Sequence, residues 1–298
     1  MALAKIATHK QAIIDIDDHK MVALAFNQHL DTVPLVFVHG FGASVNFWNG
    51  WQTDYVQQHC KWYSLSLPGH YPATFPSDFD PAEINADRLA EITTRALKKL
   101  VGNQRIILIG HSTGGFTALN VAMHAPQMVQ AVASVAGFVQ GTWTGSLGIF
   151  QRISRMGPVG RRVLWAVNRM SMVHIQVFSL IDDTYAHNVR AMNTHPDYMT
   201  SLPHFYADAK VDNVAALTQW LDHVQNIDIS AGLGTISAPA LVMVGQQDPI
   251  VPPQQAHIIH RGIPHSELIE YPDTGHMMMF ERADAYHRDL TAWLKNVM

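Results

Sequence analysis

The strongest constraint on the fold is a serine set between glycines where an apolar run changes into a helical pattern. Residues 106–109 read Ile-Ile-Leu-Ile, which is typical of a buried strand, and residues 110–114 read Gly-His-Ser-Thr-Gly. The small residues that follow suit a helix that ends before Pro126. A serine on such a sharp turn adopts strained backbone angles, so its neighbours two positions away must be small. We therefore expect Ser112 at a strand end, with its hydroxyl raised above the sheet.

The same order of strand, loop and helix recurs along the chain. Short apolar runs predict strands at residues 35–38, 62–67, 105–109, 131–136, 240–244 and 267–271, and helical spacing occurs at residues 46–59, 81–100 and 283–296. This alternation predicts a mostly parallel, doubly wound sheet of the α/β class. Residues 13–16 and 21–26 flank an acidic turn and predict an antiparallel start to the sheet.

The alternation stops between residues 141 and 230, where Met, Trp and Arg occur at helical spacing without a convincing buried strand. We expect an inserted helical cap over residues 141–230, on a core formed by residues 1–140 and 231–298. Some aromatic and Met side chains of the cap are expected to line an apolar pocket, and packing inside the cap is the alternative use for each of them. Met-rich linings adapt to varied apolar groups, which favours a small apolar acyl or ring substrate.

Five arginines of the predicted cap alternate with apolar residues, namely Arg152, Arg155, Arg161, Arg162 and Arg169. This pattern is typical of a surface helix that contacts a membrane or an anionic substrate. It is also typical of a solvated helix face, which is the interpretation we prefer from the sequence.

Composition excludes several classes of protein. A net charge of −4 and a pI near 6.5 provide no field that would attract nucleic acid. The apolar runs are far shorter than the roughly 20 residues that span a bilayer, so we expect no stable membrane insertion. The first 20 residues lack the pattern of a secretory signal, and the single cysteine, Cys60, fits a reducing compartment. We expect a cytoplasmic protein, and the oligomeric state stays open.

Five motifs carry a resemblance to a known superfamily. They are His39-Gly40-Phe41-Gly42, Pro68-Gly69-His70, the glycine-flanked serine at residues 110–115, Gly245 to Asp248, and Gly275-His276. Together they resemble the α/β-hydrolase fold superfamily over residues 12–140 and 231–298. The resemblance implies a nucleophile, an acid and a histidine in that chain order. It implies no metal or organic cofactor.

Ser112, Asp248 and His276 follow this order. A serine hydroxyl is a weak nucleophile, so a histidine must accept its proton and a carboxylate must hold that histidine. Asp248 and His276 each follow a predicted strand, at the sheet edge where open α/β sheets bind ligands. Asp273 is an alternative acid, although a turn role suits it better, and His111 is expected to be a packed neighbour of the serine.

The resemblance also assigns an oxyanion hole to the backbone N–H groups of Phe41 and Thr113. Their side chains are free to vary, because only main-chain donors are used.

Four residues near these motifs are expected to contact the substrate: His39, Gly40, Trp143 and Met277.

The combined prediction is a serine hydrolase that cleaves an ester, thioester or lactone through an acyl-enzyme on Ser112. A serine at this position argues against the haloalkane dehalogenases and epoxide hydrolases of the superfamily, which use a carboxylate. Carbon–carbon bond hydrolysis, acyl transfer, amide hydrolysis and cofactor-free haloperoxidation stay open, because fold does not settle function. A ligand-sensing receptor of the same fold is the alternative that is not an enzyme.

Overall fold

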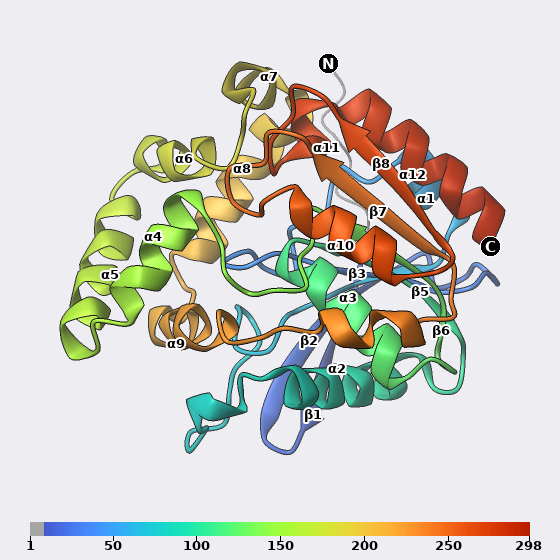
Figure 1. The fold of residues 1–298 in the computed structure, drawn as a ribbon, viewed down its shortest axis with the longest axis horizontal. Coiled ribbons are helices and arrows are strands. Elements are labelled where there is room, and N and C mark those ends of the chain that lie inside the picture. Colours follow the sequence, from blue (N-terminus) through green and yellow to red (C-terminus); the bar gives the residue numbers. More distant parts are fainter. Residues whose placement is uncertain (1–8) are drawn as a thin grey trace.

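The computed structural model describes residues 9–298, which form one eight-stranded sheet flanked by helices (Figure 1). The prediction of a mostly parallel α/β sheet is confirmed, and each predicted strand is present to within a few residues. The strands are β1 (Lys10–Ile16), β2 (His19–Phe26), β3 (Leu35–Val38), β4 (Trp62–Leu65), β5 (Ile106–His111), β6 (Val129–Val135), β7 (Ala240–Gly245) and β8 (Ser266–Tyr271).

The strand order is β1-β2-β4-β3-β5-β6-β7-β8. Strand β2 pairs antiparallel with both β1 and β4, and every other pair is parallel. Strand β5 lies in the middle of the parallel part, between β3 and β6. Its C-terminal end therefore lies beside the ends of β3 and β6, which brings the loops that follow these strands together.

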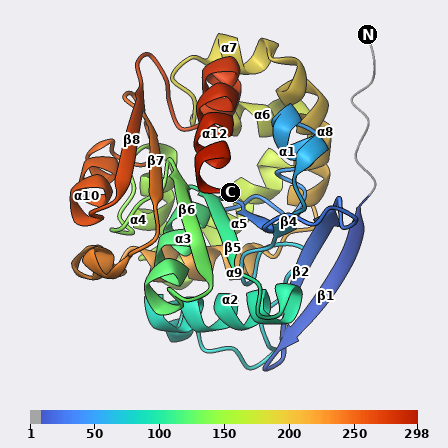
Figure 2. The same cartoon turned by 90° about the vertical axis from the view of Figure 1, so that its right-hand side faces the viewer.

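Helices cover both faces of the sheet (Figure 2). On one face lie α2 (Ala86–Val101), α3 (Thr113–His124) and α10 (Gln254–Gly262), and on the other lie α1 (Asp54–His59) and α12 (Ala283–Val297). A short helix, α11 (Met278–Glu281), precedes α12. Alternate residues of β5 divide between the two cores, with Leu108 in one and Ile107 in the other, because successive strand side chains point to opposite faces.

The predicted helix at residues 46–59 is wrong over its first half. Only α1 (Asp54–His59) is helical, and residues 46–50 form turns. Gly50 has a φ of 99°, which a helix does not allow, and the Thr53 side chain accepts a hydrogen bond from the N–H of Val56 at 3.2 Å and so starts α1. Trp48 is buried against the sheet, so the apolar spacing there reflects tertiary packing.

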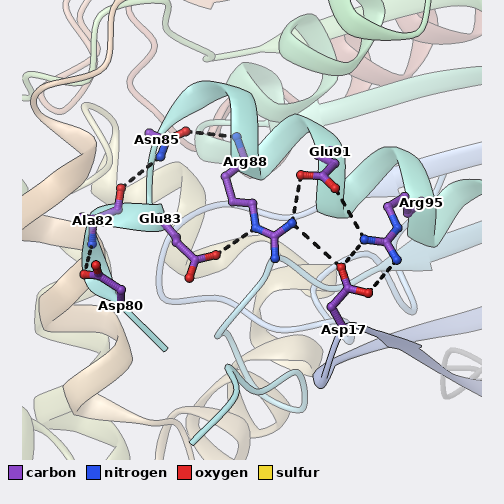
Figure 3. A network of polar contacts seen from close by, with 8 residues as sticks. All are labelled: Asp17, Asp80, Ala82, Glu83, Asn85, Arg88, Glu91 and Arg95. Atoms are coloured by element: carbon purple, nitrogen blue, oxygen red, sulfur yellow. Dashed lines mark hydrogen bonds and ion pairs between the residues drawn. The ribbon is translucent and has the colours of Figure 1, made fainter. Parts of the chain in front are cut away.

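The predicted helix at residues 81–100 is divided in two. A 3-10 turn covers Pro81–Glu83, and α2 begins after Asn85, whose side chain accepts from the N–H of Arg88 at 3.0 Å (Figure 3). The same network joins α2 to the turn between β1 and β2, because Arg95 makes a bidentate ion pair with Asp17.

Six α-helices lie between β6 and β7, on the left of Figure 1, and a 3-10 helix (Ser230–Thr235) follows them. Within residues 141–230 the structure assigns no strand, as predicted, and a single bridge between Gln140 and Asp228 holds the two ends of the segment side by side. The division into a core and a cap at residues 141 and 230 stays a prediction. The helices are α4 (Gly145–Ser154), α5 (Pro158–Ser171), α6 (Ile175–Asp183), α7 (Val189–Thr194), α8 (Pro196–Ala209) and α9 (Val214–Val224).

Among residues 9–298, no helix combines the length and the apolar character needed to cross a membrane. The cytoplasmic location stays a prediction. The prediction about the N-terminal sequence falls partly on residues 1–8, which lie outside the described residues.

Candidate active site

Ser112 lies at the turn from β5 into α3, with φ 55° and ψ −117°. Its N–H donates to the carbonyl of Val135 at 2.8 Å, which holds the turn against β6. A Cβ on Gly110 would lie 1.9 Å from the carbonyl oxygen of Gly114, and one on Gly114 would lie 2.1 Å from the carbonyl oxygen of Val38. The spacing of the two glycines is therefore required by close backbone packing, as the sequence suggested.

Asp248 and His276 meet beside this turn. The Nδ1 of His276 donates to the Oδ2 of Asp248 at 2.7 Å, and both side chains are buried. The Oδ1 of Asp248 accepts from the N–H groups of Ile250 and Val251 at 2.8 and 2.9 Å. Since Nδ1 carries the proton of the hydrogen bond, Nε2 is the basic nitrogen of a neutral His276 ring. Asp273, the alternative acid, is exposed.

Ser112 and His276 both line one pocket, which lies beneath the helices that follow β6. No hydrogen bond joins the Ser112 hydroxyl to the His276 ring in the described part of the chain. Such a bond is often long before substrate binds and shortens in the reacting complex.

Glu281 holds the loop that carries His276, and the sequence analysis missed it. This buried carboxylate accepts hydrogen bonds from the backbone N–H groups of Gly275, His187 and Asn188 at 2.9, 3.0 and 2.7 Å. It therefore ties the histidine loop to the segment between α6 and α7. The only available sequence signal was an acidic residue shortly after the Gly-His pair, which is too common to distinguish it.

His111 is a packed neighbour of the serine, as expected. Its ring stacks on Phe47, with centroids 5.4 Å apart, and its Nε2 donates to the carbonyl of His276 at 3.1 Å. Burial, followed by the nearby His276 ring, lowers the pKa of His111 well below its usual value. The ring is therefore neutral and positions the backbone of His276.

The residues predicted to contact substrate divide into two groups. Gly40 and Met277 line the pocket with Ser112, whereas His39 and Trp143 do not. The Nδ1 of His39 donates to the carbonyl of Gly40 at 2.8 Å, and its Nε2 accepts from the N–H of Leu67 at 3.1 Å. Burial lowers the pKa of His39 to about 4, so this ring is a neutral connection between two loops.

Two backbone N–H groups are available near the serine. The N–H of Phe41 has no acceptor among the described residues, and Phe41 itself lines the pocket. Thr113 is the first residue of α3, where N–H groups lack an intrahelical acceptor and the helix dipole is positive. Such donors suit an oxygen that gains negative charge.

The pocket is mainly apolar, and its charged groups are all acidic. Its lining includes Asp182, Asp208 and Asp212 and contains no lysine or arginine. Burial raises the pKa of Asp182 to about 7 and that of Asp212 to about 6. Asp208 accepts from Ser44 and Asn46 at 2.5 and 2.8 Å. The predicted cap contributes many of the apolar side chains, including Leu147, Phe150, Leu164, Met172, Phe178, Ile181, Tyr185 and Phe205.

No group of three or more His, Cys, Asp or Glu side chains within residues 9–298 is arranged to hold a metal ion.

Comparison with known proteins agrees with this architecture. Residues 33–283 match the family described as alpha/beta hydrolase fold, so the chain belongs to that family and is an enzyme of the α/β-hydrolase fold. The enol-lactonase of Burkholderia xenovorans LB400 has the same fold, with a TM-score of 0.73 at 16% identity, over 95% of this chain and all of that one.

Sequence relatives are mostly named hydrolases. The chain is 25% identical to a 2-hydroxy-6-oxononadienedioate/2-hydroxy-6-oxononatrienedioate hydrolase of Cupriavidus pinatubonensis, over 88% of this chain and 86% of that protein. It is 24% identical to the pimeloyl-[acyl-carrier protein] methyl ester esterase of Vibrio atlanticus, over 87% and 93%.

A further relative is the dihydrolipoyllysine-residue acetyltransferase component of the acetoin cleaving system of Pseudomonas putida, which is 29% identical over 88% of this chain. The chain spans only 63% of the length of that protein.

Proposed function

We propose that this enzyme is a serine hydrolase that cleaves an ester, thioester or lactone through an acyl-enzyme on Ser112. The observation that carries the proposal is the buried 2.7 Å hydrogen bond from His276 to Asp248, beside a pocket that both Ser112 and His276 line. An oriented histidine next to a serine at a helix N-terminus is the arrangement that activates a hydroxyl.

The proposed reaction has two halves. The Ser112 Oγ attacks the substrate carbonyl, while Nε2 of His276 takes the hydroxyl proton and Asp248 stabilises the resulting imidazolium. The N–H groups of Phe41 and Thr113 bind the oxyanion. His276 then gives the proton to the leaving oxygen or sulfur, which departs and leaves the acyl group on Ser112. In the second half a water molecule loses a proton to His276 and attacks the acyl carbonyl. The bond between the acyl carbon and the Ser112 Oγ then breaks, His276 returns the proton to Oγ, and the acid is released.

The lining of the pocket supports a substrate with an apolar body and no carboxylate. Asp182, Asp208 and Asp212 line the pocket and no lysine or arginine does, so the carboxylate of an anionic substrate would find no cationic partner there. A dioate of the kind named for the Cupriavidus relative has no cationic partner here. The pocket therefore favours ester, thioester or lactone cleavage over carbon–carbon hydrolysis of a dicarboxylate.

The test is hydrolysis of neutral p-nitrophenyl esters of increasing acyl length by the native enzyme, by Ser112→Ala and by the exposed control Ser77→Ala. We expect Ser112→Ala to lose several orders of magnitude in kcat/KM, and Ser77→Ala to retain native activity. The acyl length of the ester with the highest kcat/KM indicates the length of acyl chain that the pocket accommodates. Equal background in all three proteins would contradict the proposal and would turn attention to carbon–carbon hydrolysis, acyl transfer or ligand sensing.

A further inference from the structure

One surface of the molecule combines positive charge with exposed apolar side chains. Residues 141–181 contain five arginines and no aspartate or glutamate, although the whole chain carries a net charge of −4. All five arginines are exposed, and none takes part in an ion pair within residues 9–298. They are Arg152, Arg155, Arg161, Arg162 and Arg169. We call the exposed side chains of residues 149–180 the basic apolar face.

The apolar part of this face is unusually large. Nine of the 13 large apolar side chains that are exposed in the described residues lie within residues 149–180. Val173 is 76% exposed and Trp165 is 57% exposed. Scattered apolar side chains are normal on a protein surface, but a concentration of this kind marks an interaction site. The nine are Ile149, Met156, Val159, Val163, Trp165, Met170, Val173, Val177 and Leu180.

Helix α5 shows how the face is built. Its inner side chains, including Leu164 and Ser171, line the active-site pocket. Its outer side carries Arg162, Trp165 and Arg169 at helical spacing, and the Arg169 guanidinium lies 5.8 Å from the centre of the Trp165 ring. In Figure 1, α4, α5 and α6 form one edge of the molecule, far from α12 and the C-terminus. The face therefore lies away from α12, and beside α9 its residues Arg161, Arg162 and Trp165 line a hollow together with Val214, Ala215 and Thr218.

We propose that the basic apolar face binds the surface of an anionic lipid bilayer. Arginine heads pair with lipid phosphates, and the Trp and aliphatic side chains enter the boundary between headgroups and acyl chains. A second copy of the chain fits less well, because a symmetric contact would place the same five arginines against each other. Binding is confined to the surface, since no described helix is suited to cross the bilayer. The proposal does not depend on the reaction proposed for Ser112.

The test is flotation of the whole protein with vesicles of phosphatidylcholine that contain phosphatidylglycerol, compared with pure phosphatidylcholine. Trp165 provides a local signal, because the other six tryptophans are buried. We expect binding to the anionic vesicles only, weakened by salt, with quenching of Trp165 fluorescence by brominated lipid. Trp165→Ser should abolish the quenching.

A double variant tests whether vesicle binding depends on the positive charge of the basic apolar face. Arg161→Gln with Arg162→Gln should weaken vesicle binding about 25-fold, since each arginine near the surface contributes about fivefold. The control is Lys98→Gln with Lys99→Gln on α2, which removes the same charge elsewhere and should bind as the native protein does. Circular dichroism verifies that each variant is folded.

Three outcomes would overturn the proposal. The first is absence of the native protein from the anionic vesicle fraction. The second is equal vesicle binding by the two double variants. The third is a dimer of the native protein that Trp165→Ser dissociates, without vesicle binding. The last result would assign the face to self-association.

Discussion

Single residues around Ser112 are held by contacts that leave little choice of side chain. Ser112 keeps a φ of 55°, in a region that favours glycine, and its backbone is fixed to Val135. Asp248 uses one oxygen for two backbone N–H groups and the other for His276. One oxygen of this carboxylate therefore holds its own loop and the other holds His276. A substitution that replaces only one oxygen can distinguish these two roles.

Asp248→Asn is the corresponding prediction. The amide oxygen can still accept from the backbone, but the amide N–H₂ group would face Nδ1 of His276 and favour the tautomer with its proton on Nε2. We expect kcat for the best neutral ester to fall by about 10⁴ while the fold is retained. Steady-state kinetics measure this, with Asp273→Asn as the exposed control. A native rate in Asp248→Asn would remove this residue from the proposed mechanism.

The loops after the strands decide which elements converge at the site. The loop after β7 carries Asp248 and the loop after β8 carries His276, and residues before α4 contact the first of these loops. Thr144 donates its hydroxyl to the carbonyls of Pro249 and Ile250 at 2.9 and 3.0 Å. The start of the inserted helices is thereby attached to the acid loop, and Glu281 attaches a later part of them to the histidine loop.

Glu281→Gln tests this second attachment. An amide N–H₂ group would replace a carboxylate oxygen that accepts backbone N–H groups, so donors would face donors inside the protein. We expect a loss of about 2–3 kcal/mol in the free energy of unfolding. We also expect a lower kcat at temperatures where the variant is folded, because His276 loses its fixed position. Urea unfolding and ester kinetics provide the two measurements, with exposed Glu267→Gln as control; unchanged stability would contradict the role of Glu281.

At the scale of the whole molecule, the pocket exists only because the helices after β6 lie over the sheet edge. Polar contacts hold them there: Trp220 donates to the carbonyl of Pro68 at 2.9 Å, and Asp212 accepts from the N–H of Tyr71 at 3.1 Å. Two carboxyls of this layer, Asp182 and Asp212, have pKa values raised by burial. The stability of the layer therefore depends on pH.

Asp182 shows in which direction the stability changes with pH. Its pKa rises from 3.8 to about 7 on folding, so the folded protein holds this proton more tightly than the unfolded chain. The proton on Asp182 therefore stabilises the folded protein fully below about pH 4, and this stabilisation is lost as the pH rises to about 7. The free energy of unfolding falls by at most about 1.4 kcal/mol per pH unit from this group. We expect Asp182→Asn, which stays neutral and can accept from Tyr198, to show a flatter dependence. Urea unfolding between pH 4 and 8 tests this against exposed Asp284→Asn; identical slopes would contradict it.

The sequence by itself determined the strands, the parallel sheet and the positions of Ser112, Asp248 and His276. These features depend on local periodicity and on glycines that backbone packing requires, so short stretches of sequence contain the signal. Tertiary structure decided the rest. The apolar spacing around Trp48 resembles that of a helix, but it arises because Trp48 packs on the sheet. His39 connects two loops and lies outside the pocket. Glu281 accepts hydrogen bonds from residues almost 100 positions away in the sequence. Such contacts join distant segments, and no local pattern encodes them.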